Sequence, residues 1–188
     1  MKEIYQKIWK LAKPYYEKGR PMDVDHIEWM MKDALVVCEK EKLDDEIFLP
    51  LVILHDVGYA EAPKDDPTKL EMRKAHMEAG AKIAKRILES VDYPADKAER
   101  IVYYVSVHDN WAFGDDEYKI DKLLGAFKDL DFIWMATPKG FPAMMKVLGK
   151  NKQEMIEYVE SRPEDEDFEF SCTTTKELFA NYLSERKK

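Results

Sequence analysis

The most apolar stretch of the chain is Ile47-Phe48-Leu49-Pro50-Leu51-Val52-Ile53-Leu54, and it ends at the polar dipeptide His55-Asp56. A histidine and an aspartate at the end of a buried segment are costly to remove from water unless a hydrogen-bonding partner or a metal ion compensates them. A short apolar run fits a buried strand and a buried helix equally well. Because the surrounding segments have helical periodicity, we expect this run to form a buried helix.

The overall composition is typical of a single globular domain. The chain has 188 residues, of which 45% are hydrophobic and 36% charged, and this is enough for one core of ordinary size. The apolar run around Pro50 is far shorter than the ~20 residues that span a bilayer, and the first residues lack the apolar region of a signal peptide. We therefore expect one domain over residues 1–188, located in the cytoplasm.

The net charge and the cysteine content limit the compartment and the kinds of binding partner that we expect. The two cysteines, Cys38 and Cys172, make no disulfide framework, which fits a reducing cytoplasm. The net charge of -8 argues against a nucleic-acid surface or an anionic membrane surface, since both need a basic patch. A small phosphorylated partner stays compatible with this charge if metal ions supply local positive charge. The oligomeric state is left open.

Apolar residues recur at helical spacing along almost the whole chain, and no alternating strand pattern is convincing. The stripes predict helices near residues 4–15 (with Leu11 on the apolar face), 27–38, 70–89, 98–108 and 120–134, followed by a C-terminal helical extension over 151–188. Asp25 and Glu28 resemble a capping box at the start of the second helix. Loops are expected at 62–67 and 163–167. The predicted fold class is all-α.

The chain has only four histidines, which are His26, His55, His76 and His108. His76 and His108 continue the apolar stripe of a predicted helix, and His26 lies in the first turn of another. A single histidine on an apolar face is more often a hydrogen-bonded core residue than a ligand. Taken with the aspartates, however, five predicted helices would each bury a polar group, and one shared site compensates all of them.

Asp131 adds a carboxylate to this set, since it lies four residues after Phe127 and three before Trp134 on one helical face. Asp129 lacks that alignment, because two residues turn a helix by about 200°. Imidazoles and carboxylates without a thiolate suit iron, manganese, nickel, cobalt or zinc. We expect one or two divalent ions. Six candidate ligands exceed the needs of one tetrahedral ion, and a carboxylate that bridges two ions would accommodate them.

The order of these residues resembles a known signature. His26, then His55-Asp56, then Asp131 resembles the H…HD…D pattern of the HD-domain metal-dependent phosphohydrolase superfamily. Residues 54–58 resemble the family's helix end, an apolar residue, HD, an apolar residue and Gly. Residues 76–81 (HMEAGA) resemble the H-x-x-x-G-A segment of members with a second metal, which also place a histidine where His108 ends its helix. Residues 129–131 resemble the family's D-A-D stretch, and the resemblance covers residues 20–135.

The resemblance implies a single-domain HD-type helical bundle with the metal site at its centre. His26, His55, Asp56 and Asp131 would hold one ion, and His76 and His108 a second ion bridged by Asp56, which makes Asp56 the predicted catalytic residue. The nucleophile would be a metal-activated hydroxide. Phe132 is a departure, since many members have Arg or Lys after the second aspartate, and a phosphate contact from this position is therefore in question.

The expected function is a metal-dependent phosphohydrolase acting on a small phosphorylated substrate, a nucleotide or another phosphoester. Two alternatives stay open, a di-iron oxygenase on the same scaffold and a non-catalytic metal-binding sensor module. The substrate-binding residues are not assigned by the sequence. Candidates on loops after the ligand helices are Tyr59, Asn110, Trp111 and Lys139, and Asp109 is a candidate partner for a metal-bound histidine.

Overall fold

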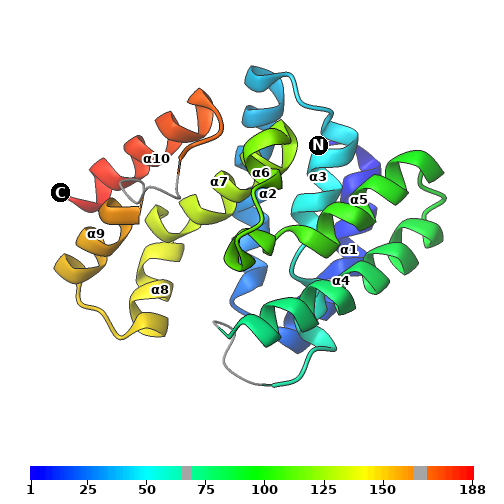
Figure 1. Cartoon of the computed structure of the whole chain (residues 1–188), viewed down its shortest axis with the longest axis horizontal. Coiled ribbons are helices and arrows are strands. Elements are labelled where there is room, and N and C mark those ends of the chain that lie inside the picture. The colour runs from blue at the N-terminus through cyan, green and yellow to red at the C-terminus, as the bar shows by residue number, and fades with distance from the viewer. Residues whose placement is uncertain (65–68, 163–168) are drawn as a thin grey trace. The chain divides into compact units, whose positions relative to one another are not determined.

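The computed structural model of the chain describes residues 1–64, 69–162 and 169–188 (Figure 1). These residues form ten α-helices and three 3-10 helices and no strand, which confirms the all-α fold class. None of the helices in these ranges is long and apolar enough to cross a membrane. The loop predicted at 163–167, and residues 65–67 of the loop predicted at 62–67, lie outside the described ranges.

The chain divides into two compact units, Met1–Glu117 and Tyr118–Lys188. The prediction of one domain over residues 1–188 stays a prediction. The first unit contains α1 (Glu3–Gly19), α2 (Asp23–Glu41), α3 (Asp45–Leu54), η1 (Val57–Ala60), α4 (Leu70–Ser90), α5 (Ala95–Val107) and η2 (Asn110–Phe113). Within it α3 contacts α1, α2 and α5, and the short η1 packs against α1 and α4.

The apolar run that ends at the HD pair is the helix α3, as expected. All of its residues from Ile47 to Leu54 are buried. The helix begins at an N-terminal cap, where the Asp44 side chain accepts a hydrogen bond from the Glu46 amide at 2.9 Å. Pro50 has no N–H for the carbonyl of Glu46 four residues earlier, and the Tyr93 hydroxyl donates to that carbonyl instead, at 2.7 Å. This hydrogen bond lets α3 carry a proline in its interior.

The start of the chain differs from the prediction in two details. Leu11 is 42% exposed, whereas Tyr5 and Tyr16 are buried in α1. The two tyrosines are tolerated in the core because their hydroxyls donate to the Asp45 carboxylate at 2.7 Å and to the Ile53 carbonyl at 2.8 Å. The capping box predicted at Asp25 is wrong, because α2 already begins at Asp23 and has no side-chain cap.

The second unit contains α7 (Lys122–Ile133), η3 (Trp134–Ala136), α8 (Gly140–Leu148), α9 (Lys152–Ser161) and α10 (Thr173–Arg186), and the short α6 (Glu117–Ile120) spans the boundary between the units. The helix predicted over 120–134 is therefore two helices. Asp121 separates them, because its side chain accepts from the amides of Leu123 and Leu124 and starts α7. Ile120, predicted on the apolar face, is 87% exposed.

A buried carboxylate joins α7 to α10 within this second unit. Asp129 is fully buried, and its Oδ2 accepts from the Ser171 amide and the Thr175 hydroxyl, both at 2.7 Å. Burial raises the pKa of Asp129, and the hydrogen bond from Thr175 lowers it; burial is the larger effect, so the pKa lies at about 6. Phe132 packs against Phe179, with ring centroids 5.5 Å apart. The C-terminal extension is thus held to α7 by both polar and aromatic contacts.

Candidate metal centre

His55 and Asp56 form the link between two elements. α3 ends at Leu54 and η1 begins at Val57, so the pair lies where the chain leaves the buried helix. Gly58 then lets η1 approach α4 closely, since a Cβ at this position would lie only 1.8 Å from the backbone oxygen of His76. This close approach brings the HD pair next to the first half of α4.

Three of the histidines are held in the same way. Each places Nδ1 against a backbone carbonyl three or four residues earlier in the chain: His55 to Val52 at 3.0 Å, His76 to Met72 at 3.2 Å and His108 to Val105 at 2.8 Å. A carbonyl only accepts, so Nδ1 carries the proton and donates in all three rings. The lone pair of each neutral imidazole is then on Nε2, which is the atom that a metal ion takes.

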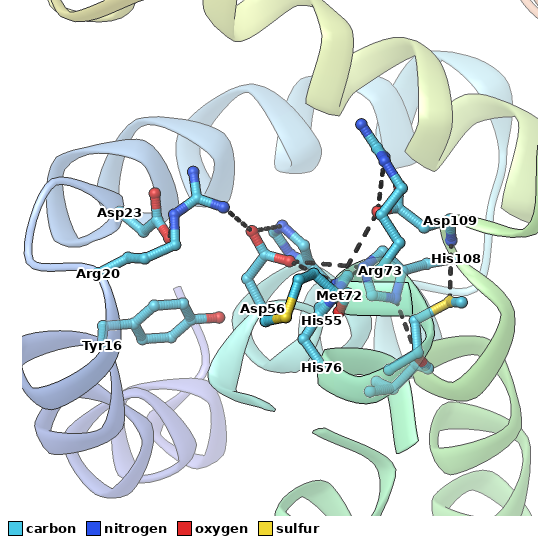
Figure 2. A network of polar contacts seen from close by, with 12 residues as sticks. Tyr16, Arg20, Asp23, His55, Asp56, Met72, Arg73, His76, His108 and Asp109 are labelled. Atoms are coloured by element: carbon cyan, nitrogen blue, oxygen red, sulfur yellow. Dashed lines mark hydrogen bonds and ion pairs between the residues drawn. The ribbon is translucent and has the colours of Figure 1, made fainter. Parts of the chain in front are cut away.

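The three Nε2 atoms converge on the carboxylate of Asp56 (Figure 2). His76 and His108 lie 3.3 and 3.5 Å from Oδ1, and His55 lies 3.5 Å from Oδ2. The Nε2 atoms of His76 and His108 are themselves 3.1 Å apart. Two lone pairs at this distance repel unless a proton or a cation lies with them. The donor set therefore fits a divalent transition metal ion.

The carboxylate of Asp56 is set up to stay ionised. Burial favours the neutral acid, but the interactions with His55, His108 and His76 outweigh it and hold the pKa of Asp56 well below its usual range. The side chain is only 12% exposed. Asp56 thus offers a largely enclosed negative charge with two oxygens, each of which faces different nitrogen atoms.

His26 lies close to this carboxylate. It is buried in the first turns of α2, and its ring centroid is 5.6 Å from that of His55. Asp23, His26 and Asp56 form one group that can hold an ion, and Asp56, His76 and His108 form another, with ligand atoms within 4.8 Å of one another in each group. Because both groups contain Asp56, a carboxylate that bridges two ions is compatible with this arrangement.

The first unit therefore brings together five of the six residues predicted as ligands, namely His26, His55, Asp56, His76 and His108. The sixth, Asp131, is a half-buried residue of α7 in the second unit, and its place in the site stays a prediction. Asp23 was missed as a candidate ligand. It precedes His26 by three residues and so shares its helical face, which is a signal that the sequence already contains.

A first arginine, which the sequence did not single out, lies beside the HD pair. Arg20 Nε forms an ion pair with Asp23 Oδ2 at 3.1 Å, and its Nη1 lies 3.9 Å from Asp56 Oδ2. Its guanidinium is 4.5 Å from the ring centroid of Tyr59. That ring in turn stacks on His76, with centroids 4.2 Å apart and planes 6° from parallel. Burial raises the pKa of Asp23, and the charge of Arg20 lowers it; burial is the larger effect, so the pKa lies at about 6.

A second arginine is held on α4. Asp109 Oδ2 accepts from Arg73 Nη1 at 2.7 Å and lies 3.8 Å from His76 Nε2. Asp109 Oδ1 accepts from the indole N–H of Trp111 at 3.1 Å, and Arg73 lies 5.0 Å from that ring centroid. Asp109 is therefore beside a candidate ligand histidine, where the sequence placed it. Arg73 was missed, although it precedes His76 by three residues on one helix.

Two of the four loop candidates for substrate binding, Tyr59 and Trp111, contact residues of the centre. The Asn110 side chain donates to the Asp115 carboxylate at 3.4 Å, and Lys139 belongs to the second unit. Substrate contacts by Asn110 and Lys139 stay predictions without support from these contacts.

Comparison with known proteins gives one match. The family model described as the HD domain matches residues 23–157, which is more than half of the 188-residue chain and contains all six predicted ligands. No curated protein and no solved structure matches the chain.

Proposed function

This chain belongs to the HD domain family, whose members are mostly metal-dependent hydrolases, and on that basis we propose that it is a metal-dependent phosphohydrolase of small phosphorylated molecules such as nucleotides. The observation that carries the proposal is the convergence of three imidazole Nε2 atoms on the one carboxylate of Asp56, whose side chain is 12% exposed. Each of these imidazoles is already fixed through Nδ1.

In this proposal Asp56, His76 and His108 would hold one divalent ion, and His26, His55, Asp56 and Asp131 would hold the other. A bound divalent ion lowers the pKa of water toward neutrality and neutralises phosphoryl oxygens, which is the chemistry that phosphate hydrolysis needs. The assignment of Asp131 rests on the family resemblance. Asp23, which groups with His26 and Asp56, is a further carboxylate available to this second ion.

The protein's own contribution is to fix and orient its ligands. The backbone carbonyls of Val52, Met72 and Val105 hold the imidazoles at one tautomer and one ring orientation, so little reorganisation is needed when a ligand binds. Tyr59 adds a flat surface against the His76 ring. Asp56, kept ionised, supplies negative charge to whatever cation the histidines bind.

The remaining features support a small-molecule substrate in a reducing compartment. The net charge of -8 gives no general attraction for nucleic acid. Cys38 is a buried thiol, and burial raises its pKa to about 12, so it stays protonated and poorly reactive. Both observations are compatible with an enzyme of the cytoplasm.

The proposal is tested on the purified full chain. Bound metals are measured by elemental analysis, and turnover is assayed on nucleotides, phosphomonoesters and phosphodiesters with added Mn²⁺, Fe²⁺, Ni²⁺ or Co²⁺. We expect bound metal and a phosphate-releasing activity that a chelator removes and metal restores, with the Asp56→Ala variant inactive. Absence of metal and of turnover across the panel refutes the proposal. Bound iron with oxygen-dependent turnover replaces it with the oxygenase alternative.

A further inference from the structure

The two arginines beside the candidate metal centre come from separate segments but are mounted alike. Arg20, between α1 and α2, forms an ion pair with the buried carboxylate of Asp23, and Arg73, on α4, donates to the buried carboxylate of Asp109. Each guanidinium also lies over an aromatic ring. Arg20 is 4.5 Å from the centroid of Tyr59, and Arg73 is 5.0 Å from the centroid of Trp111. Such mounting holds a planar guanidinium in one orientation.

Neither arginine uses all of its N–H donors on its carboxylate. The contacts to the carboxylates use Nε of Arg20 and Nη1 of Arg73, whereas a guanidinium has five N–H donors. The side chains remain 29% and 23% exposed. The second nearby contact of Arg20, from Nη1 to Asp56 Oδ2, is 3.9 Å and therefore longer than a hydrogen bond. Both groups keep donors that an incoming anion can use.

Both arginines also belong to the same site as the histidines. Figure 2 shows Arg20 and Arg73 with the Asp56 carboxylate and its histidines between them. Arg20 lies over the Tyr59 ring, which stacks on His76 with centroids 4.2 Å apart, and the carboxylate that holds Arg73 lies 3.8 Å from Nε2 of the same histidine.

We propose that Arg20 and Arg73 together bind the phosphate group of the substrate, and that the substrate is a phosphomonoester. This inference rests on the proposed function and names the substrate class of the same site. A guanidinium fork matches two phosphate oxygens, and two such forks match the double negative charge of a terminal phosphate. A phosphodiester has a single charge and two esterified oxygens, so it gains less from two arginines.

The test measures binding of inorganic phosphate to the metal-loaded full chain by calorimetry, which does not depend on turnover. Arg20→Gln and Arg73→Gln should each weaken phosphate binding by roughly tenfold to a hundredfold, as expected for a lost charge-assisted hydrogen bond. The control is Arg86→Gln, because Arg86 lies on α4 as Arg73 does and forms a 2.9 Å ion pair with Glu61 on the surface. It should change the affinity by less than about twofold.

Metal content and unfolding temperature are measured for every variant. If a glutamine variant loses its metal, Arg20→Lys and Arg73→Lys decide instead, since lysine keeps the charge and the ion pair but lacks the fork. These lysine variants should keep metal and still bind phosphate more weakly than the wild type. Unchanged phosphate affinity in all metal-loaded variants of both arginines overturns the inference.

Turnover separates the inference from the function on which it rests. With p-nitrophenyl phosphate, the arginine variants should raise KM more than they lower kcat, and bis(p-nitrophenyl) phosphate should be a much poorer substrate. Faster cleavage of the diester overturns the assignment of a phosphomonoester. If phosphate binds and the arginine variants abolish this binding, but no phosphorylated compound is turned over, the anion site stands and the proposed hydrolase activity fails.

Discussion

Substitution of Gly58 by alanine is expected to damage both the fold and the metal centre. An ideal Cβ at this position would lie 1.8 Å from the His76 oxygen and 2.5 Å from the Gly80 nitrogen. Both atoms belong to the backbone of α4, so no side-chain rotation relieves the contact. Ordinary contact begins at 3.4 Å, which means that η1 and α4 must separate by about 1.6 Å.

The size of the effect follows from this separation. Overpacking usually costs about 1–3 kcal/mol, and a clash of backbone with backbone belongs at the upper end, about 3 kcal/mol. In a protein of this size each kcal/mol lowers Tm by roughly 2–4 °C, so we expect a fall of roughly 6–12 °C. The same movement carries His76 away from Asp56, where Nε2 and Oδ1 are now 3.3 Å apart. The ion held by that pair should therefore be lost first.

Thermal unfolding followed by circular dichroism, with elemental analysis of the purified variant, measures both effects. Gly80→Ala is the matched control. Its Cβ would lie 3.3 Å from the His55 oxygen and from Val105 Cγ1, a contact that shifts of a few tenths of an ångström relieve. Removal of a helical glycine also gains up to about 1 kcal/mol, so little net change is expected. A Gly58→Ala protein that melts within 2 °C of the wild type and keeps its metal refutes the reasoning.

Three further outcomes test the site and the packing. Asp56→Ala should abolish activity and remove both ions, whereas His76→Ala should weaken only one, and equal metal loss in the two variants contradicts a bridging carboxylate. Tyr93→Phe should lower the free energy of unfolding by about 1 kcal/mol in urea titrations; the loss should shrink when Pro50→Ala restores an N–H to the same carbonyl. Thr175→Val removes a 2.7 Å hydrogen bond to a buried carboxylate of α7 and should cost about 1.5–3 kcal/mol; an unchanged urea midpoint excludes a stabilising role for it.

The helices of the first unit other than α3 were predictable because each buries an apolar stripe. α4 shows this best, since His76, Gly80, Ile83 and Ile87 recur at helical spacing and all are buried. The prediction failed where polar groups change the pattern. Tyr5 replaces Leu11 in the core because its hydroxyl reaches Asp45, a residue 40 positions away. A contact between such distant segments leaves no local trace in the sequence.

The site was predictable to a similar extent and for a related reason. Histidines are few in this chain, so their positions on apolar faces were conspicuous, and the structure brings all four next to Asp56. Arg20 and Arg73 were not conspicuous. Charged residues on helices normally face solvent, and Arg73 reveals its role only through Asp109, 36 positions further along the chain.

The choice between Asp129 and Asp131 rested on helical alignment, a rule that requires a helix with a single apolar face. The alignment argument assumed that α7 has one apolar face, but all residues from Leu123 to Leu130 are buried, and Asp129 is among them. Burial therefore does not favour Asp131, which is half-buried whereas Asp129 is fully buried. Hydrogen bonding does, because Oδ2 of Asp129 already accepts from Ser171 and Thr175, which fixes this side chain to the segment that begins α10. A carboxylate fixed in this way serves the fold of the second unit, and Asp131 stays the predicted ligand on α7.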